Sequence, residues 1–434
     1  MTFCEKKAPK FVNNTTDLSQ LIMTACMYMF KSGKRQGTQC GKEADGRPLC
    51  PRHLSAATRP LPISASPFID SLDMLQYKLL ALETTSTNKA TICKKFRYLQ
   101  GLPPTSTEYQ KNFNWLRHAL TFPYNKSRNL PVSLGTTGNT AEVSRYVTSV
   151  YNKLDSYIYG MQDVKEELMS YVCKRISNPE SNDHVLALQG CNGVGKTRMA
   201  HGLAKALDLP IKQINLGSIN DVSYFTGHGF TYVDSEPGRV VQILNETQCC
   251  NMIILFDELD KVHQTEKGQA IYGYLTHLID NTQNSRYQDV YLSGLELDVS
   301  RIFFVFTFNN LEAIDATVRD RLKIVKVKEP SALDKGNIAE KFILPELCTN
   351  MRFPVSINRD FIDAIVAQQK DNGGLRGVRR VLEDIVGKLN VSRMLDRDVQ
   401  RKLTYFGSTS DDMIRNIMTK HDKDDLGHAL SMYA

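Results

Sequence analysis

The feature that most constrains this chain is a glycine-rich octet at residues 190–197, with the sequence GCNGVGKT. It matches the phosphate-binding pattern G-x-x-x-x-G-K-[ST]. An apolar run at 184–188 precedes it, and apolar positions at helical spacing follow from Met199 to Leu207. Strand, loop and helix in this order surround a phosphate group with backbone N–H groups and a helix N-terminus. The octet, called the phosphate loop below, predicts a nucleoside triphosphate site in an α/β fold.

The residue types of the phosphate loop suit this chemistry. Glycines allow the backbone to turn its N–H groups inward. We expect Lys196 to meet the outer phosphates and Thr197 to offer a hydroxyl to Mg²⁺. The alternative, a glycine-rich turn without a ligand, fits the strand, lysine and helix less well. The expected phosphate-binding set is Gly190, Cys191, Asn192, Gly193, Val194, Gly195, Lys196 and Thr197.

A pair of acids follows the apolar strand expected at 252–256. The first, Asp257, is expected to hold the Mg²⁺ shell, and the second, Glu258, to activate the attacking water. The alternative is an ordinary helix cap after a strand, which would prevail if the phosphate loop were absent. With the loop present, the pair indicates ATP hydrolysis.

Further strands are expected at 211–216, 301–308 and 322–327, giving five in a parallel sheet. Asn309 ends the fourth, where an amide can position water against a phosphate. Before the fifth strand, Arg321 is expected to project into a neighbouring subunit's nucleotide as an arginine finger. The alternative for this side chain is a surface salt bridge with Asp320. Beyond Pro330 the patterns are helical.

The N-terminal segment combines positive charge with possible metal ligands. Residues 1–60 hold ten Lys and Arg against four Asp and Glu, so this segment carries +6 of the formal net charge of +7. Cys26, Cys40, Cys50 and His53 could bind a structural Zn²⁺. The alternative is a set of unrelated free cysteines in a basic tail. The charge makes contact with nucleic acid or an acidic partner an open alternative.

The composition excludes several classes of protein. No apolar run reaches the length of a transmembrane helix, and residues 1–10 contain no apolar core of a signal peptide. We therefore expect an intracellular protein without membrane contact, in the cytoplasm, or in the host cytoplasm or virion if its source is viral. Ten cysteines in 434 residues are too few for a disulfide scaffold.

Several motifs together resemble an AAA+ ATPase, and in particular the ATPase module of Lon-type proteases. The most specific are YGMQDVKE at 159–166, GHGFTYV at 227–233 with PGR at 237–239, and FDELDK at 256–261. A helix ending in FPY at 122–124 is similar to the segment before the Lon core. The resemblance covers roughly residues 109–395, two thirds of the chain. The Cys/His segment resembles small modules attached to proteins of large DNA viruses.

The resemblance implies a role for each matching residue, a hexameric ring and a protein substrate. Two positions depart from the family, since Cys191-Asn192 replace the usual Pro-Pro and Gly229-Phe230 replace two arginines of the pore loop. The implied roles are Asn309 as sensor 1, Arg321 as the finger, Arg379 as the sensor-2 arginine of the lid, Tyr159 and Gly160 as further nucleotide-binding residues, and Tyr232 and Val233 as the pore loop that grips a polypeptide.

The expected fold is an AAA+ α/β core with a C-terminal helical lid and a small Cys/His segment. We expect no peptidase activity, because no Ser–Lys peptidase motif appears after residue 395. The expected function is ATP-driven remodelling of protein; the alternatives are a nucleic-acid-associated ATPase and a non-catalytic nucleotide-switched scaffold. The expected segments are 1–55 (zinc), 56–106 (linker with a short helix), 107–159 (helical lead-in), 160–330 (ATPase), 331–400 (lid) and 401–434 (tail).

Overall fold

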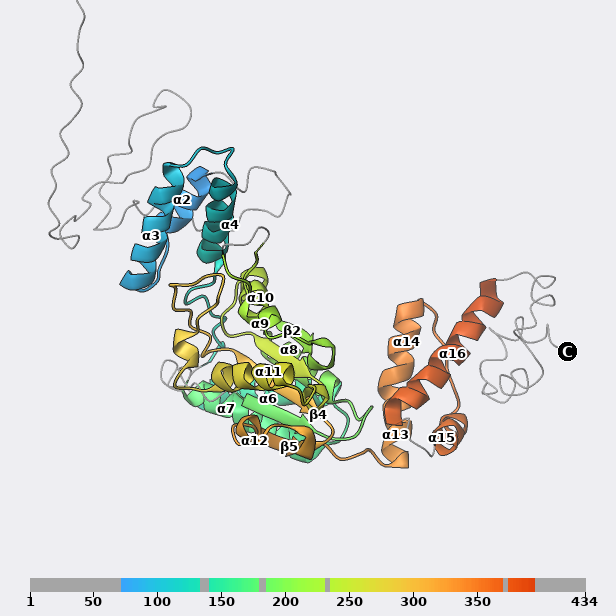
Figure 1. The fold of residues 1–434 in the computed structure, drawn as a ribbon. Helices are drawn as coiled ribbons and strands as arrows, with labels where there is room; N and C mark the ends of the chain where they lie inside the picture. The colour runs from blue at the N-terminus through green and yellow to red at the C-terminus, as the bar shows by residue number, and fades with distance from the viewer. Residues whose placement is uncertain (1–71, 133–139, 179–184, 231–234, 370–373, 395–434) are drawn as a thin grey trace, which may run out of the picture. The chain divides into compact units, whose positions relative to one another are not determined.

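The computed structural model forms two compact units, residues 1–124 and 125–434, which are considered separately (Figure 1). The Zn²⁺ ligands expected at Cys26, Cys40, Cys50 and His53 lie outside the described residues. Among the residues that are described, no group of three or more His, Cys, Asp or Glu side chains could hold a metal ion. The described residues are 72–132, 140–178, 185–230, 235–369 and 374–394.

The described part of the first unit is helical. Its helices are α2 (Leu72–Leu80), α3 (Ser86–Gln100) and α4 (Thr107–Thr121). Trp115 of α4 is fully buried, and the Lys95 ammonium of α3 lies 4.2 Å from the centre of its ring. Burial lowers the pKa of Lys95 to about 8. The contact between α3 and α4 explains why the first unit extends to Tyr124, inside the expected lead-in at 107–159.

Helix α3 was not predicted, because its first turn is composed of polar residues that resemble a linker. The Thr85 side chain accepts a hydrogen bond from the Asn88 backbone N–H and caps the helix. Ile92, Phe96 and Leu99 then lie at helical spacing and are buried. The segment expected as a linker with one short helix therefore contains two helices in its described part.

The second unit contains a parallel sheet of five strands within the described residues, which confirms the expected fold class. The strand order is β2-β3-β4-β1-β5. Because β3, β4 and β1 are neighbours, their carboxyl ends bring together Asp257, Asn309 and the phosphate loop. The strands are β1 (Val185–Gln189), β2 (Ile211–Asn215), β3 (Ile253–Asp257), β4 (Phe303–Phe308) and β5 (Lys323–Lys326).

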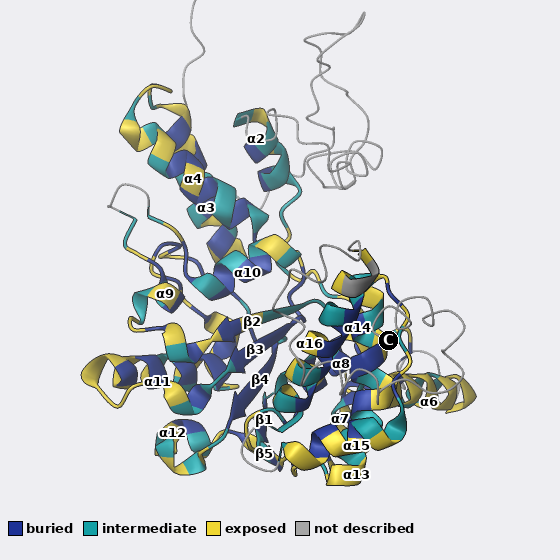
Figure 2. Cartoon of the chain, turned by 90° about the vertical axis from the view of Figure 1, so that its right-hand side faces the viewer, coloured by how far each residue is buried: buried dark blue, intermediate teal, exposed yellow. Residues whose placement is uncertain are grey.

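Helices cover both faces of this sheet, and its three central strands β3, β4 and β1 are largely buried (Figure 2). One face, including Leu255 and Val305, shares a core with α6 (Thr140–Tyr157), α7 (Gln162–Ser177) and α8 (Lys196–Leu207). On the other face, Phe256 packs against Phe225, which stacks on Tyr274. The remaining elements of this α/β part are η2 (Leu216–Ser218), α9 (Ser223–Thr226), α10 (Arg239–Thr247), η3 (Leu259–Lys261), α11 (Glu266–Ile279), η4 (Asn284–Arg286), η5 (Leu311–Ala313) and α12 (Ala316–Arg319).

Residues 332–394, called the lid, form a helical segment with a core of its own. That core includes Leu347, Ile362, Val378 and Leu382. The first lid helices are continuous through a π-helical turn, a feature often found near functional sites. Among the described helices, none is long and apolar enough to cross a membrane. The lid elements are α13 (Ala332–Ile338), η6 (Ala339–Ile343), α14 (Leu344–Met351), α15 (Arg359–Gln368) and α16 (Gly374–Met394).

Candidate nucleotide-binding site

The phosphate loop connects β1 to α8, and its glycines occupy positions where a side chain is disfavoured. Gly193 and Gly195 have φ angles of 79° and 98°, which L-residues rarely adopt. A Cβ on Gly190 would lie 2.6 Å from the Val327 carbonyl oxygen. The sequence pattern therefore reflects backbone conformation at two glycines and close packing at the third.

Lys196 lies at the centre of the site. Its ammonium donates hydrogen bonds to the carbonyl oxygens of Gly190 (2.7 Å) and Cys191 (2.9 Å) and to Asn309 Oδ1 (2.7 Å). Burial lowers the pKa of Lys196, while the carboxylates of Asp257 and Asp260 act in the opposite direction. The ammonium is thus held where the loop can present it to a phosphate.

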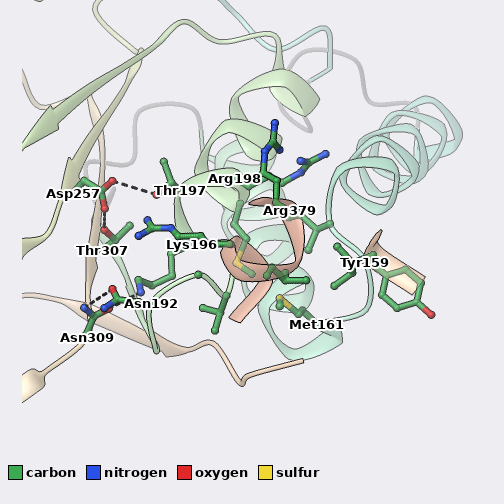
Figure 3. Close-up of a pocket in the computed structure, with 18 of the residues that line it drawn as sticks. Tyr159, Met161, Asn192, Lys196, Thr197, Arg198, Asp257, Thr307, Asn309 and Arg379 are labelled. Atoms are coloured by element: carbon green, nitrogen blue, oxygen red, sulfur yellow. Dashed lines mark hydrogen bonds between the residues drawn. The ribbon is translucent and has the colours of Figure 1, made fainter. Parts of the chain in front are cut away.

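The Asp257 carboxylate lies beside hydroxyl oxygens that suit Mg²⁺ (Figure 3). Its Oδ2 accepts hydrogen bonds from Thr197 Oγ1 (3.2 Å) and Gln213 Nε2 (2.8 Å), and its Oδ1 accepts one from the Thr307 hydroxyl. A carboxylate beside a hydroxyl of the phosphate loop matches the hard oxygen ligands that Mg²⁺ prefers. These residues therefore fit the metal that the sequence predicts.

The predicted catalytic pair Glu258 and Asn309 also line the same pocket. The Glu258 backbone N–H donates to Thr307 Oγ1 at 3.3 Å, and the residue has a left-handed φ of 62°. The amide of Asn309 accepts from Lys196 and donates to Asn192 Oδ1 at 2.9 Å. The amide is thus fixed between two residues of the phosphate loop.

The pocket has a volume of about 250 Å³, and the side opposite the acids is largely apolar. The π-helical turn of the lid contributes Phe342 and Ile343 to its wall. The Tyr159 ring meets the Phe342 ring edge to face, with centroids 6.2 Å apart. Gly160, with φ of 60°, forms the turn before α7. An apolar wall beside a phosphate-binding loop suits a flat base with an attached triphosphate.

Two lid arginines, rather than one, line this pocket. The predicted Arg379 donates from Nη2 to Glu346 Oε1 at 2.8 Å. Arg376, one turn earlier, is close enough for its charge to contribute to the lowered pKa of Lys196. Helix α16 begins against the phosphate loop, since a Cβ on Gly374 would lie 3.0 Å from the Asn192 carbonyl oxygen. Arg376 is therefore a second candidate for the sensor-2 arginine.

Arg321 lies outside the described lining of this pocket. Its Nη1 donates to the Thr317 carbonyl oxygen at 2.9 Å and its Nη2 to Asp280 Oδ2 at 3.4 Å. The salt-bridge partner is thus Asp280, not the Asp320 considered as the alternative. The side chain keeps 40% of its surface exposed, as a finger for a neighbouring subunit requires.

The predicted pore-loop residues Tyr232 and Val233 lie outside the described residues, but the base of their loop is described. Gly227 and Pro237 form an antiparallel bridge. The buried Asp289 carboxylate accepts the Gly238 backbone N–H at 2.7 Å. Burial raises the pKa of Asp289 to about 6. The loop base is therefore fixed to the segment that leads into β4.

Five residues at or beside the site were not predicted from the sequence. A Thr within a buried strand, a Gln on an edge strand and charged residues on helices are common in any α/β protein, and their roles depend on tertiary neighbours. Arg376 alone had a usable sequence signal, because Gly374-Leu375-Arg376 has the same Gly-x-Arg pattern as Gly377-Val378-Arg379. The five residues are Arg198, Gln213, Thr307, Glu346 and Arg376.

Comparison with protein families gives a match at residues 186–329 to the ATPase family associated with various cellular activities (AAA). The chain contains an AAA domain. The match begins in β1 and ends after β5, so that it encloses the phosphate loop, the acid pair and Asn309.

The region around the AAA domain is similar to Lon proteases. A Lon protease homolog of Acanthamoeba polyphaga mimivirus is 34% identical over 264 residues, which cover 60% of this chain and 26% of that protein. The Lon protease of Campylobacter concisus is 32% identical, with coverages of 58% and 32%. The mitochondrial Lon protease homolog of Yarrowia lipolytica is 31% identical, with coverages of 68% and 24%. The chain thus spans about a quarter to a third of these relatives.

Proposed function

We propose that this protein hydrolyses ATP and uses the energy to remodel or thread protein substrates, without cutting them itself. The observation that carries the proposal is the convergence of Lys196, Asp257, Glu258 and Asn309 on one pocket that also has an apolar wall. The Lon-like AAA domain supports ATP as the nucleotide. The scaffold alternative is disfavoured because each of these positions carries a residue competent for hydrolysis.

In this proposal each side chain acts where charge develops. Lys196 and the loop N–H groups hold the phosphates, while Thr197 and Asp257 hold Mg²⁺, which when bound neutralises phosphate charge. Glu258 orients a water and accepts its proton. Asn309, fixed by Asn192, donates a hydrogen bond beside the phosphate that is cleaved. Tyr159 and Gly160 lie beside the nucleobase of the bound nucleotide.

We further propose a ring, in which Arg321 of one subunit completes the site of the next and Tyr232 and Val233 line a central pore. The exposure of Arg321 supports the first part. The fixed base of the 227–238 loop supports the second, because a loop that pulls a polypeptide needs an anchored base. An aromatic side chain can grip a chain of any sequence by apolar contact.

We expect the rate of ATP hydrolysis by the full chain to rise severalfold when an unfolded protein such as casein is added. We also expect the full chain to assemble into an oligomer when ATP is present. Steady-state ATPase assays and light scattering measure the two effects. Stimulation by DNA or RNA, with casein inert, would instead support a nucleic-acid-associated ATPase. The net charge of +6 in residues 1–60 favours that second candidate.

The zinc content of the full-length protein tests the proposed Cys/His site.

Of the two lid arginines, we propose that Arg376 contacts the terminal phosphate. Arg376→Ala is expected to lower kcat roughly tenfold or more, because it removes charge that acts during cleavage. Arg379→Ala is expected to act mainly on KM, since this side chain is held by Glu346. Steady-state kinetics of both variants decide between them. A larger loss of kcat in Arg379→Ala would restore Arg379 to the role expected from sequence.

A further inference from the structure

One carboxylate joins three helices at the edge of the nucleotide pocket. Glu346, in the first turn of α14, accepts from Arg379 of α16 at 2.8 Å through Oε1. Through Oε2 it accepts from Arg198 of α8 at 2.9 Å. Arg198 directly follows Lys196 and Thr197, so the carboxylate connects the lid to the helix that begins at the phosphate loop.

Arg198 makes two further contacts, one with the end of α6 and one with the lid. Its Nε donates to the Tyr157 carbonyl oxygen at 3.4 Å, and its guanidinium lies 5.8 Å from the centre of the Phe342 ring. Phe342 belongs to the π-helical turn that forms part of the pocket wall. A single side chain in the first turn of α8 thus contacts the lid through both a carboxylate and an aromatic ring.

The arrangement places the arginines, and not the carboxylate, at the cavity. Arg198 and Arg379 are among the lining residues, whereas Glu346 is outside the described lining. Their side chains lie next to each other in the close-up view (Figure 3). Two guanidinium groups this close would repel each other without the shared carboxylate. Glu346 therefore fixes the position of both while leaving them at the pocket wall.

The lid supplies much of that wall, so its position affects ligand affinity. Ile338, Phe342, Leu375 and Arg376 all come from the lid. A contact that holds the lid on α8 organises these residues before a nucleotide binds, which reduces the ordering cost of binding. By linkage, a bound nucleotide must stabilise the same contact by an equal factor.

We propose that Glu346 is a positioning residue that fastens the lid to the phosphate-binding helix through Arg198, while it holds Arg379 within the lid, and thereby couples nucleotide affinity to lid closure. The inference rests on the proposed function, because it assumes that the pocket takes ATP. It goes beyond that function by naming the contact through which the lid responds to the nucleotide.

The test is nucleotide binding by the full-length Glu346→Gln protein, measured with a fluorescent ATP analogue. The Kd is expected to rise about fivefold or more, with a similar rise in KM and a kcat within about twofold of wild type. Asp384→Asn is the matched control. It removes an ion pair (3.1 Å to Lys388) that lies within α16 and does not reach α8, so its Kd should match wild type.

A double-mutant cycle separates coupling from a general loss of stability. Glu346→Gln combined with Arg198→Met should bind ATP about as weakly as Arg198→Met alone, because the carboxylate acts through this arginine. Glu346→Asp, which keeps the charge, should recover part of the affinity, and it replaces Glu346→Gln if that variant does not fold. Unchanged Kd in Glu346→Gln, or effects that simply multiply in the double variant, would overturn the inference. Absence of ATP binding by wild type would instead overturn the proposed function.

Discussion

Glu258→Gln is expected to reduce ATP turnover roughly 100-fold or more, with the Kd for ATP within about threefold of wild type. The carboxylate is the proposed base, whereas the phosphates are held by Lys196 and the loop N–H groups. Glutamine keeps the shape of the side chain but cannot accept the proton of the attacking water. The variant should therefore retain bound ATP.

Single-turnover hydrolysis and equilibrium binding of ATP measure the two effects separately. Glu266→Gln is a suitable control, because Glu266 is exposed in the first turn of α11 and lies outside the described lining of the pocket. Turnover in Glu258→Gln equal to that of this control would remove Glu258 from the mechanism. Loss of ATP binding would mean that the substitution disturbs the site as a whole.

The second large effect concerns two inactive variants that restore activity to each other. Arg321→Ala is expected to reduce turnover roughly 1000-fold, as the loss of an arginine finger does. Mixed with Glu258→Gln, it should recover activity, because an Arg321→Ala subunit keeps its own Glu258 and takes Arg321 from its neighbour. In a random equal mixture about a quarter of the interfaces are complete, so about a quarter of wild-type turnover should return.

The mixing experiment needs evidence that subunits exchange, which native mass spectrometry of differently tagged chains supplies. Arg319→Ala serves as the control for the same motif and should remain active on its own. If exchange is complete and the mixture stays inactive, Arg321 acts within its own subunit or only in the salt bridge with Asp280. If Arg319→Ala is the inactive variant, the finger has been assigned to the wrong arginine.

The fold could be predicted largely because its signals are local. The five segments predicted as strands form the strands of the sheet, and the phosphate loop connects β1 to α8 as predicted. The site was predicted where a residue follows a strand, as Asp257 and Asn309 do. The prediction of the site was incomplete where a role depends on packing between distant segments. Thr307 is the one polar residue of the apolar strand β4, and its role appears only because β4 pairs with β3, which places its hydroxyl on Asp257.

The lid illustrates the same limit. A Gly-Val-Arg motif indicated Arg379, but the choice between two arginines on one helix depends on what each faces. In the structure Arg379 is hydrogen-bonded to Glu346, whereas the charge of Arg376 contributes to lowering the pKa of Lys196. Helix α3 was missed for a related reason, since its polar first turn needs the burial of Ile92 and Phe96 to be stable.

Strand β4 has a mechanical consequence. Its carboxyl end carries Thr307 and Asn309 to the phosphate site, and its amino end continues from the segment in which Asp289 fixes Gly238. Six extended residues span about 20 Å and cannot lengthen. A displacement at one end must therefore appear at the other or be absorbed by the neighbouring strands. β4 thus has one end at the phosphate site, and its other end is joined through the segment from Asp289 to Ile302 to the base of the loop at 227–238.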